Sequence, residues 1–256
     1  MNIFKDLYYI NKKSLTKASH LLIKNWPILF TGIVYSILGI MVTTIIGLFM
    51  TNFILRFFTG IVLFLMISAI LSNYLYLIFK IVKHGRFNFQ DFKYGFTVYL
   101  RKIYISLLII WIVDMLLGRI IMPIIGGVLH PSVLYIILYL LGFILLNPLP
   151  ETIYQKHYSY GENFSYAFSF VKENWIEWFL PNIVFIVVLF FGLRMTFINI
   201  FSLNFAFISG LSFVEILTSI LTLAIISFAM IYRGILFEIL STSTRRKRMF
   251  MRNMYK

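Results

Sequence analysis

The ionisable side chains that lie inside apolar stretches are the residues of this sequence whose chemistry most needs an explanation. Asp114 lies eleven residues into one such stretch, about 16 Å along a helix axis. Charged groups at this depth of an apolar run are costly, and they commonly serve ion, proton or substrate pathways. Asp114 has no expected partner on its own helix, so it is either protonated or paired with a neighbouring helix. We therefore take Asp114 as the best single candidate for a coupling or substrate site.

Three further charged residues lie near one end of their apolar stretches. Arg119 follows Asp114 by five residues, Arg194 has a similar place in a later stretch, and Glu215 lies near the start of the last one. In one interpretation, Glu215 forms an ion pair with one of the two arginines. In the other, the arginines extend outward to water and Glu215 is solvated. The sequence leaves both interpretations open.

An Asn-Pro-Leu-Pro-Glu run interrupts another apolar stretch. Pro148 and Pro150 remove backbone donors and free the carbonyls of the preceding turn. Broken helices in transporters line binding sites, so this place and Asp114 together favour a small solute or ion transporter or channel. The commoner interpretation is a helix that ends at the membrane surface, with a solvated Glu151 facing Lys156 or His157.

Most families of catalytic motif are missing from the sequence. There is no cysteine, which excludes disulfides, thiolate nucleophiles and Cys-type zinc sites. The four histidines have no metal-ligand spacing, and no nucleotide-binding or hydrolase motif is found. We therefore predict no cofactor and no metal, and the sequence weighs against an enzyme. A surface pair between Arg233 and Glu238 is expected near the end of the last apolar stretch.

The composition places these residues in a membrane. Of the 256 residues, 61% are hydrophobic and 12% are charged, and the mean hydropathy is +0.90. Soluble domains carry about 25% charged residues, so this chain lacks the polar surface of a soluble fold. We predict an all-α, polytopic membrane protein with one transmembrane domain over residues 1–256. Six apolar stretches have the length of a membrane-spanning helix: 28–50, 57–80, 103–123, 132–150, 176–196 and 211–235.

The basic residues predict the orientation. The formal net charge is +14, and twenty of the 23 lysine and arginine residues lie on one side if the chain crosses six times. Cytoplasmic segments are enriched in lysine and arginine. Both termini are therefore expected in the cytoplasm, in a multi-pass protein of a bacterial cytoplasmic membrane. This rule accounts for the positive charge without nucleic acid.

The segments before the first, third and fifth stretches resemble one another. Ala18, Gly95 and Ala167 coincide when the segments are aligned, and a Lys-Asn-Trp run of the first matches a Glu-Asn-Trp run of the third. A period of about 75 residues predicts three copies of one unit, a short amphipathic helix followed by a helical hairpin. The predicted repeats are 13–85, 89–161 and 162–240, with a basic tail at 241–256.

These segments have helical amphipathicity. In the first, Lys13, Lys17, His20 and Lys24 form a polar stripe opposite an apolar stripe of Leu15, Ala18, Leu22 and Trp26. In a purely structural interpretation, the segments anchor the start of each span and set its orientation. In a functional interpretation, they form a cytoplasmic collar that binds lipid headgroups or a soluble partner. The candidate contacts to anionic lipid are Lys17, Lys24, Lys93, Arg101, Arg245, Arg246, Lys247 and Arg248.

Two short runs carry a resemblance to a known group of proteins: the Pro-Leu-Pro-Glu-Thr-Ile-Tyr run at 148–154 and the Phe-Val-Lys-Glu-Asn-Trp run at 170–175. Through these runs the chain resembles a group of poorly characterised six-span membrane proteins of Firmicute-type bacteria. That group is similar to the membrane domain associated with glycerophosphodiester phosphodiesterases. The resemblance implies a six-helix membrane domain. No phosphodiesterase domain is present in this sequence, so it implies no such activity.

Three functions remain as hypotheses. We favour a non-enzymatic scaffold, regulator or lipid-interacting accessory protein, which meets anionic headgroups at the cytoplasmic side and a membrane-protein partner or a second copy of itself. The alternative is the transporter or channel with a site near Asp114 and the break at Pro148–Pro150. A membrane enzyme acting on lipids has least support, because it needs Glu151, His157 and Glu177 to converge.

Overall fold

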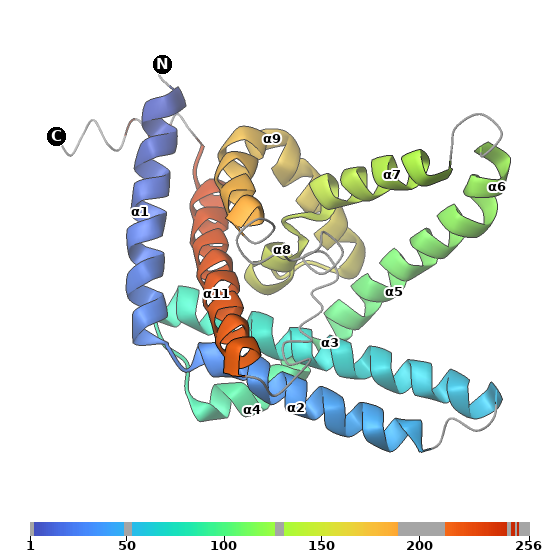
Figure 1. The fold of residues 1–256 in the computed structure, drawn as a ribbon. Coiled ribbons are helices and arrows are strands. Elements are labelled where there is room, and N and C mark those ends of the chain that lie inside the picture. The colour runs from blue at the N-terminus through green and yellow to red at the C-terminus, as the bar shows by residue number, and fades with distance from the viewer. Residues whose placement is uncertain are drawn as a thin grey trace.

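The computed structural model describes residues 3–48, 53–125, 131–188, 213–244, 247–248 and 250. Within these ranges all regular structure is helical, as the sequence predicts (Figure 1). The elements are α1 (Ile3–Lys24), α2 (Ile28–Gly47), α3 (Phe53–His84), α4 (Phe89–Val98), α5 (Leu100–Leu116), the π-helix η1 (Leu117–Ile121), α6 (Met122–Ile125), α7 (Pro131–Leu146), α8 (Leu149–Gln155), α9 (Tyr160–Val187) and α11 (Phe213–Thr242).

Five helical stretches of the described chain are long and apolar enough to cross a membrane. They correspond to five of the six predicted spans, so the described part of the chain has the helix lengths and hydropathy expected of a membrane protein. The stretches are Ile28–Gly47, Phe58–His84, Leu100–Ile120, Val133–Gln155 and Ile220–Thr242.

The remaining predicted span, 176–196, lies partly outside the described residues. Its first half belongs to α9, which begins at Tyr160 and so joins the third amphipathic segment to the apolar stretch. Asn174 departs from helical geometry inside α9, with φ −127° and ψ 21°, and divides it into two arms. A sixth span and the three-copy organisation stay predictions.

A buried aromatic and aliphatic core lies where α3, α9 and α11 meet. Trp178 and Phe237 are both fully buried, and the ring of Phe237 also lies 4.6 Å from that of Phe170. Leu77 and Ile231 fill the same core from α3 and α11. The core is thus built from helices far apart in the sequence, because each contributes one apolar face to the junction.

Helices α1 and α11 lie side by side and run crosswise to α2 and α3 (Figure 1). Tyr232 of α11 donates a hydrogen bond to Asn11 of α1 at 2.5 Å. The α2–α3 and α5–α7 hairpins extend away from this pair (Figure 1). Helix α1 therefore runs crosswise to the candidate spans of α2 and α3 and alongside the candidate span of α11 (Figure 1).

The turn between α1 and α2 resembles the bend inside α9. Asn25 Nδ2 donates to the carbonyl oxygen of Leu21 at 2.8 Å, and Asn174 Nδ2 donates to that of Phe170 at 3.2 Å. Each asparagine side chain therefore bonds the carbonyl oxygen four residues back, and at Asn25 the backbone N–H donates to the same oxygen at 3.0 Å. The next residue is an exposed tryptophan in both cases. These are the asparagines that the predicted repeat aligns.

The small residues of the three aligned segments all lie at close helix contacts. Ala18 and Ala167 are fully buried, and Gly95 is buried against α3. A Cβ on Gly95 would lie 2.9 Å from Asn73 Nδ2 and 3.1 Å from Asn73 Cα. Asn73 Nδ2 donates to the carbonyl oxygen of Phe92, so α4 is fastened to α3 through its backbone.

Candidate functional site

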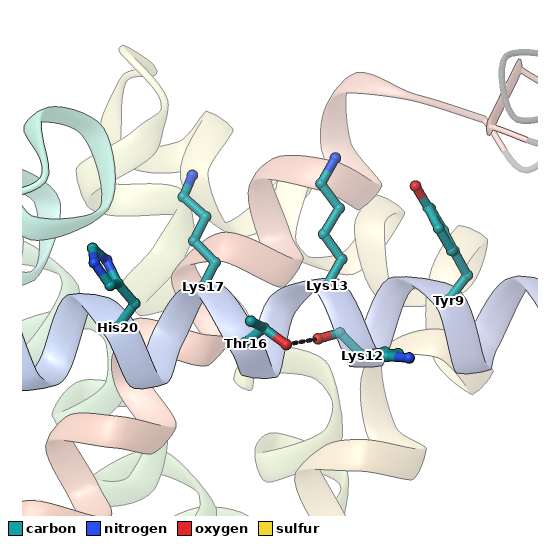
Figure 2. A pocket seen from close by; sticks show the side chains of 6 residues that line it. All are labelled: Tyr9, Lys12, Lys13, Thr16, Lys17 and His20. Atoms are coloured by element: carbon teal, nitrogen blue, oxygen red, sulfur yellow. Dashed lines mark hydrogen bonds between the residues drawn. The ribbon is translucent and has the colours of Figure 1, made fainter. Parts of the chain in front are cut away.

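The exposed side of α1 carries a shallow, open cleft with a basic lining. Lys13, Lys17 and His20 extend to the same side of the helix, with Tyr9 at one end of the row (Figure 2). They recur at intervals of three or four residues, which places them on one face of a helix. Lys12 and Thr16 complete the lining. This surface, the six residues just named, is called the α1 basic surface below.

Helix α1 has three faces rather than the two that the sequence predicts. Leu7, Ile10, Ala18 and Leu21 are buried, and this face packs on α11. The members of the predicted apolar stripe are divided between two of these faces. Leu15 and Trp26 are 41% and 59% exposed, whereas Ala18 is buried. The narrow contact with α11 covers only one side of the apolar residues.

The exposed apolar residues of α1 form a strip between its buried face and its lysines. Tyr8 is 68% exposed, and it lies on the same side of the helix as the exposed Leu15. Large apolar side chains left open beside lysines are typical of helices that lie at a membrane surface, with the apolar strip among acyl chains and the cations at the headgroups.

The lysines of the α1 basic surface have no carboxylate partner within the described residues. By contrast, Lys80 lies 3.1 Å from Asp91, and Lys83 lies 2.6 Å from Glu238. Lys12 lies 5.9 Å from the ring of Tyr8, which leaves its charge uncompensated. The positive charge of α1 is thus available to an external anion.

The other predicted lipid contacts divide into exposed and engaged residues. Lys24, Lys93 and Arg101 are exposed; Lys93 lies over the ring of Phe89, and Arg101 over that of Tyr160. Lys247 is exposed, whereas Arg245 and Arg246 lie outside the described residues.

Arg248 corrects the prediction for the basic tail. Its Nη2 lies 2.9 Å from Asp6 Oδ2, both side chains are less than one-tenth exposed, and its Nη1 donates to the carbonyl oxygen of Ser243. Arg248 therefore joins the end of α11 to the start of α1 and is not a free headgroup contact. This pairing could not be predicted from the sequence, because the two residues lie near opposite ends of it.

Glu151 also departs from prediction. The sequence predicts a solvated carboxylate near Lys156 or His157, but Glu151 is fully buried and both its oxygens accept from Arg233, at 2.8 and 2.9 Å. The predicted pair between Arg233 and Glu238 is also wrong, because Arg233 turns inward to Glu151. Glu238 binds Lys83 at the surface instead.

The helix break at the prolines is confirmed, and Arg233 explains how it is accommodated. Between α7 and α8, the carbonyl oxygen of Asn147 accepts a hydrogen bond from Arg233 Nη2 at 2.7 Å. The Asn147 side-chain oxygen accepts from Trp178 Nε1 at 2.8 Å, and Arg233 lies 5.0 Å from the Trp178 ring. The carbonyl oxygen of Asn147, at the turn between the two helices, is therefore bound within the protein.

Lys156 does not approach Glu151 closely enough to form an ion pair in the described structure. Its ammonium lies 5.2 Å from the ring of Tyr166 and 5.9 Å from that of Phe237. Burial, and to a lesser extent the neighbouring charge of Lys83, lowers the pKa of Lys156. This lysine is thus a packed side chain, unlike those of α1.

Asp114 has a partner on the neighbouring helix. The hydroxyl of Tyr139 on α7 donates to Asp114 Oδ1 at 3.2 Å, and both residues are exposed on the described surface. Asp114 lines neither the α1 cleft nor a second cleft between α9 and the end of α11.

The other charged candidates are not brought together by the described structure. Arg119 lies in η1 with an exposed side chain. Arg194 lies outside the described residues, and Glu215 lies in α11 with a side chain outside them. The predicted pair between Glu215 and an arginine stays a prediction.

The site offers binding chemistry rather than catalytic chemistry. Within the described residues, no three histidine or carboxylate side chains are grouped to hold a metal ion. The α1 basic surface presents ammonium groups and hydroxyls, which are donors suited to phosphate oxygens. Comparisons of the chain with protein-family models, with curated proteins and with solved structures found no match in any of the three. The resemblance to the six-span bacterial group stays a prediction.

Proposed function

We propose that this chain is a non-enzymatic accessory protein of a bacterial cytoplasmic membrane, which binds anionic lipid headgroups through α1. The observation that carries the proposal is the order of faces around α1. One face packs on α11, the next exposes the apolar side chains of Tyr8 and Leu15, and the third exposes Lys13 and Lys17. This order lets one helix contact protein, acyl chains and phosphate at once.

The positive charge supports the cytoplasmic side as the place of this contact. The basic residues cluster at one side if the chain crosses six times, and the cytoplasmic leaflet attracts cations because its headgroups are negative. Both termini are then cytoplasmic. The matched bonds at Asn25 and Asn174 support the three-copy organisation, in which the amphipathic helices form a collar.

The proposal is tested by measuring lipid preference in the purified full-length chain. The protein is held in a neutral detergent, and bound phosphatidylglycerol and phosphatidylcholine are counted by native mass spectrometry. We expect wild type to retain phosphatidylglycerol preferentially. Each lysine near a charged surface contributes about 1 kcal/mol, so Lys13→Gln with Lys17→Gln should weaken phosphatidylglycerol binding about thirtyfold at low salt.

Two control variants separate this contact from net charge and from folding. Lys80→Gln with Lys83→Gln removes the same charge from lysines already in ion pairs, and should leave the lipid preference within about twofold of wild type, because paired cations are not available to phosphate. Lys13→Arg with Lys17→Arg keeps the charge and should keep the binding. Equal losses in the two glutamine variants would contradict the assignment to α1.

The transporter hypothesis is less well supported. The carbonyl at the helix break, which it needs as a ligand, is bound by Arg233. Asp114 lies on an exposed hairpin next to Tyr139 rather than at that break. Its test is solute or ion flux through proteoliposomes, with Asp114→Asn abolishing the signal.

A further inference from the structure

The α5–α7 hairpin is far less covered by the described protein than the central helices. In its two candidate spans 11% of residues are buried, against 44% in α3 and 50% in α11. Lipid suffices to cover the apolar side chains of such a hairpin. It does not suffice for a carboxylate, because charged groups in membrane helices almost always face protein or water.

Asp114 is that carboxylate, and its environment within the hairpin is incomplete. It accepts one hydrogen bond, from Tyr139. One turn further along, a Cβ on Gly118 would lie 2.8 Å from the Tyr135 hydroxyl, so the two tyrosines bridge α7 to this side of α5 and η1. A tyrosine hydroxyl does not neutralise a carboxylate, and a cationic partner is needed.

Arg119 is a cation that needs an anionic partner. Its side chain is exposed, and it forms no ion pair within the described residues. Five residues separate it from Asp114, which puts the two side chains on different sides of the helix. The two side chains therefore cannot easily form an ion pair within one α5–η1 segment. Their charges are nevertheless opposite, so each is a suitable partner for the other.

We propose that the α5–α7 hairpin is the interface of a homodimer, in which Asp114 of each copy pairs with Arg119 of the other. In a two-fold interface a contact from residue i to residue j is repeated from j to i, so one dimer contains two such pairs. Both charges are then removed from lipid by a second copy of this chain. The proposal is independent of headgroup binding by α1.

The geometry of parallel helices allows this pairing. Two copies in one membrane have the same orientation, so Asp114 and the opposing Arg119 differ in depth by about 7.5 Å along the helix axis. Helical side chains lean toward the N-terminus of their helix, which directs the long arginine side chain toward the depth of Asp114. Trp111 lies one turn before Asp114 and two before Arg119, between them around the helix, and is 57% exposed.

The first test is disulfide crosslinking in the full-length chain, which has no native cysteine. Trp111→Cys lies on the proposed face, and Val113→Cys lies on the opposite side of the same helix at 48% exposure. In proteoliposomes at low protein density, we expect an oxidised dimer from Trp111→Cys and at least about fivefold less from Val113→Cys, because a polar helix contact fixes one face. Equal crosslinking, or monomer in both, would overturn the proposal; monomer would leave another membrane protein as the occupant.

The second test asks whether the ion pairs join different copies. Asp114→Asn or Arg119→Gln in the Trp111→Cys background removes both pairs of the homodimer, so each variant should weaken dimerisation about eightfold to three-hundredfold, which is twice the free energy of one polar contact between membrane helices. A mixture of the two variants should regain heterodimer, because one of the two pairs is restored. No recovery on mixing would place the pairing within one chain. Unchanged thermal melting of each variant serves as the folding control.

Discussion

At the scale of the residue, the ion pair of Glu151 with Arg233 shows how a chain of this composition places charge inside itself. Both guanidinium contacts to the carboxylate are below 3 Å, a third goes to the Asn147 carbonyl oxygen, and the Trp178 ring covers the arginine. Both carboxylate oxygens have a partner, as do Nε and Nη2 of the guanidinium, and such hydrogen bonding is the condition under which a buried pair is tolerated.

Removing one member of this pair should destabilise the protein strongly. Glu151→Gln leaves Arg233 without a counter-charge, and breaking a buried pair costs about 3–5 kcal/mol. We expect the melting midpoint in detergent to fall by about 6–12 °C. Lys83→Gln is the matched control, because it breaks a half-exposed pair between α3 and α11 and should cost less than about 1 kcal/mol. Similar losses in the two variants would contradict the burial of Glu151.

The lowered pKa of Lys156 predicts a dependence of stability on pH. Between the lowered pKa in the folded protein and the higher ordinary value, the unfolded chain binds more protons than the folded one. Stability contributed by this group therefore rises with pH through that window. Relative to Lys156→Met, wild type should gain melting temperature as the pH rises toward the ordinary lysine pKa of about 10.4. A constant difference between the two proteins would show that Lys156 is not perturbed.

The residue scale is also where prediction from sequence fails most often, and the cause is long-range pairing. The prolines predict a break after Asn147, but nothing local indicates that Arg233 turns back to it. Asp6 and Arg248 likewise pair across nearly the whole chain. One usable signal was missed at Trp178. A buried tryptophan needs a hydrogen-bond acceptor for its ring N–H, and the side-chain oxygen of Asn147 is that acceptor.

At the scale of the element, close approach of α4 to α3 depends on a residue without a side chain. Gly95 to Ala places a Cβ 2.9 Å from Asn73 Nδ2 and 3.1 Å from the α3 backbone, so α4 must shift. Such overpacking costs about 1–3 kcal/mol. Gly39→Ala is the control, because its Cβ would meet nothing within 4 Å and alanine is the better helix former. Melting in detergent should fall for the first variant and not for the second.

The sequence predicts the helices well because hydrophobic length and helical periodicity are local properties. Five apolar stretches and the helices at α1, α4 and the first arm of α9 lie close to where the pattern puts them. Boundaries are less accurate: α3 continues to His84 rather than ending at 80, because its last turns are covered by α8 and α11. The three faces of α1 could not be predicted, because only the contact with α11 divides its apolar residues.

At the scale of the whole molecule, apolar hairpins are joined at one end by a layer of amphipathic helices. The core lies at this junction, and the exposed apolar side chains lie mainly along the hairpins and on one strip of α1. A soluble protein rarely exposes such large apolar patches. The claim on which the proposals rest is that lipid covers both the hairpins and that strip.

A spin-label scan along α1 in reconstituted vesicles tests this claim most directly. Single cysteines in the cysteine-free chain carry the label, and its collisions with oxygen in lipid and with a nickel chelate in water are measured. We predict that labels at Tyr8 and Leu15 meet oxygen, that labels at Lys13 and Lys17 meet nickel, and that a label at Ala18 meets neither. Labels at Tyr8 and Leu15 as accessible to nickel as those at the lysines would place α1 in water and contradict the account.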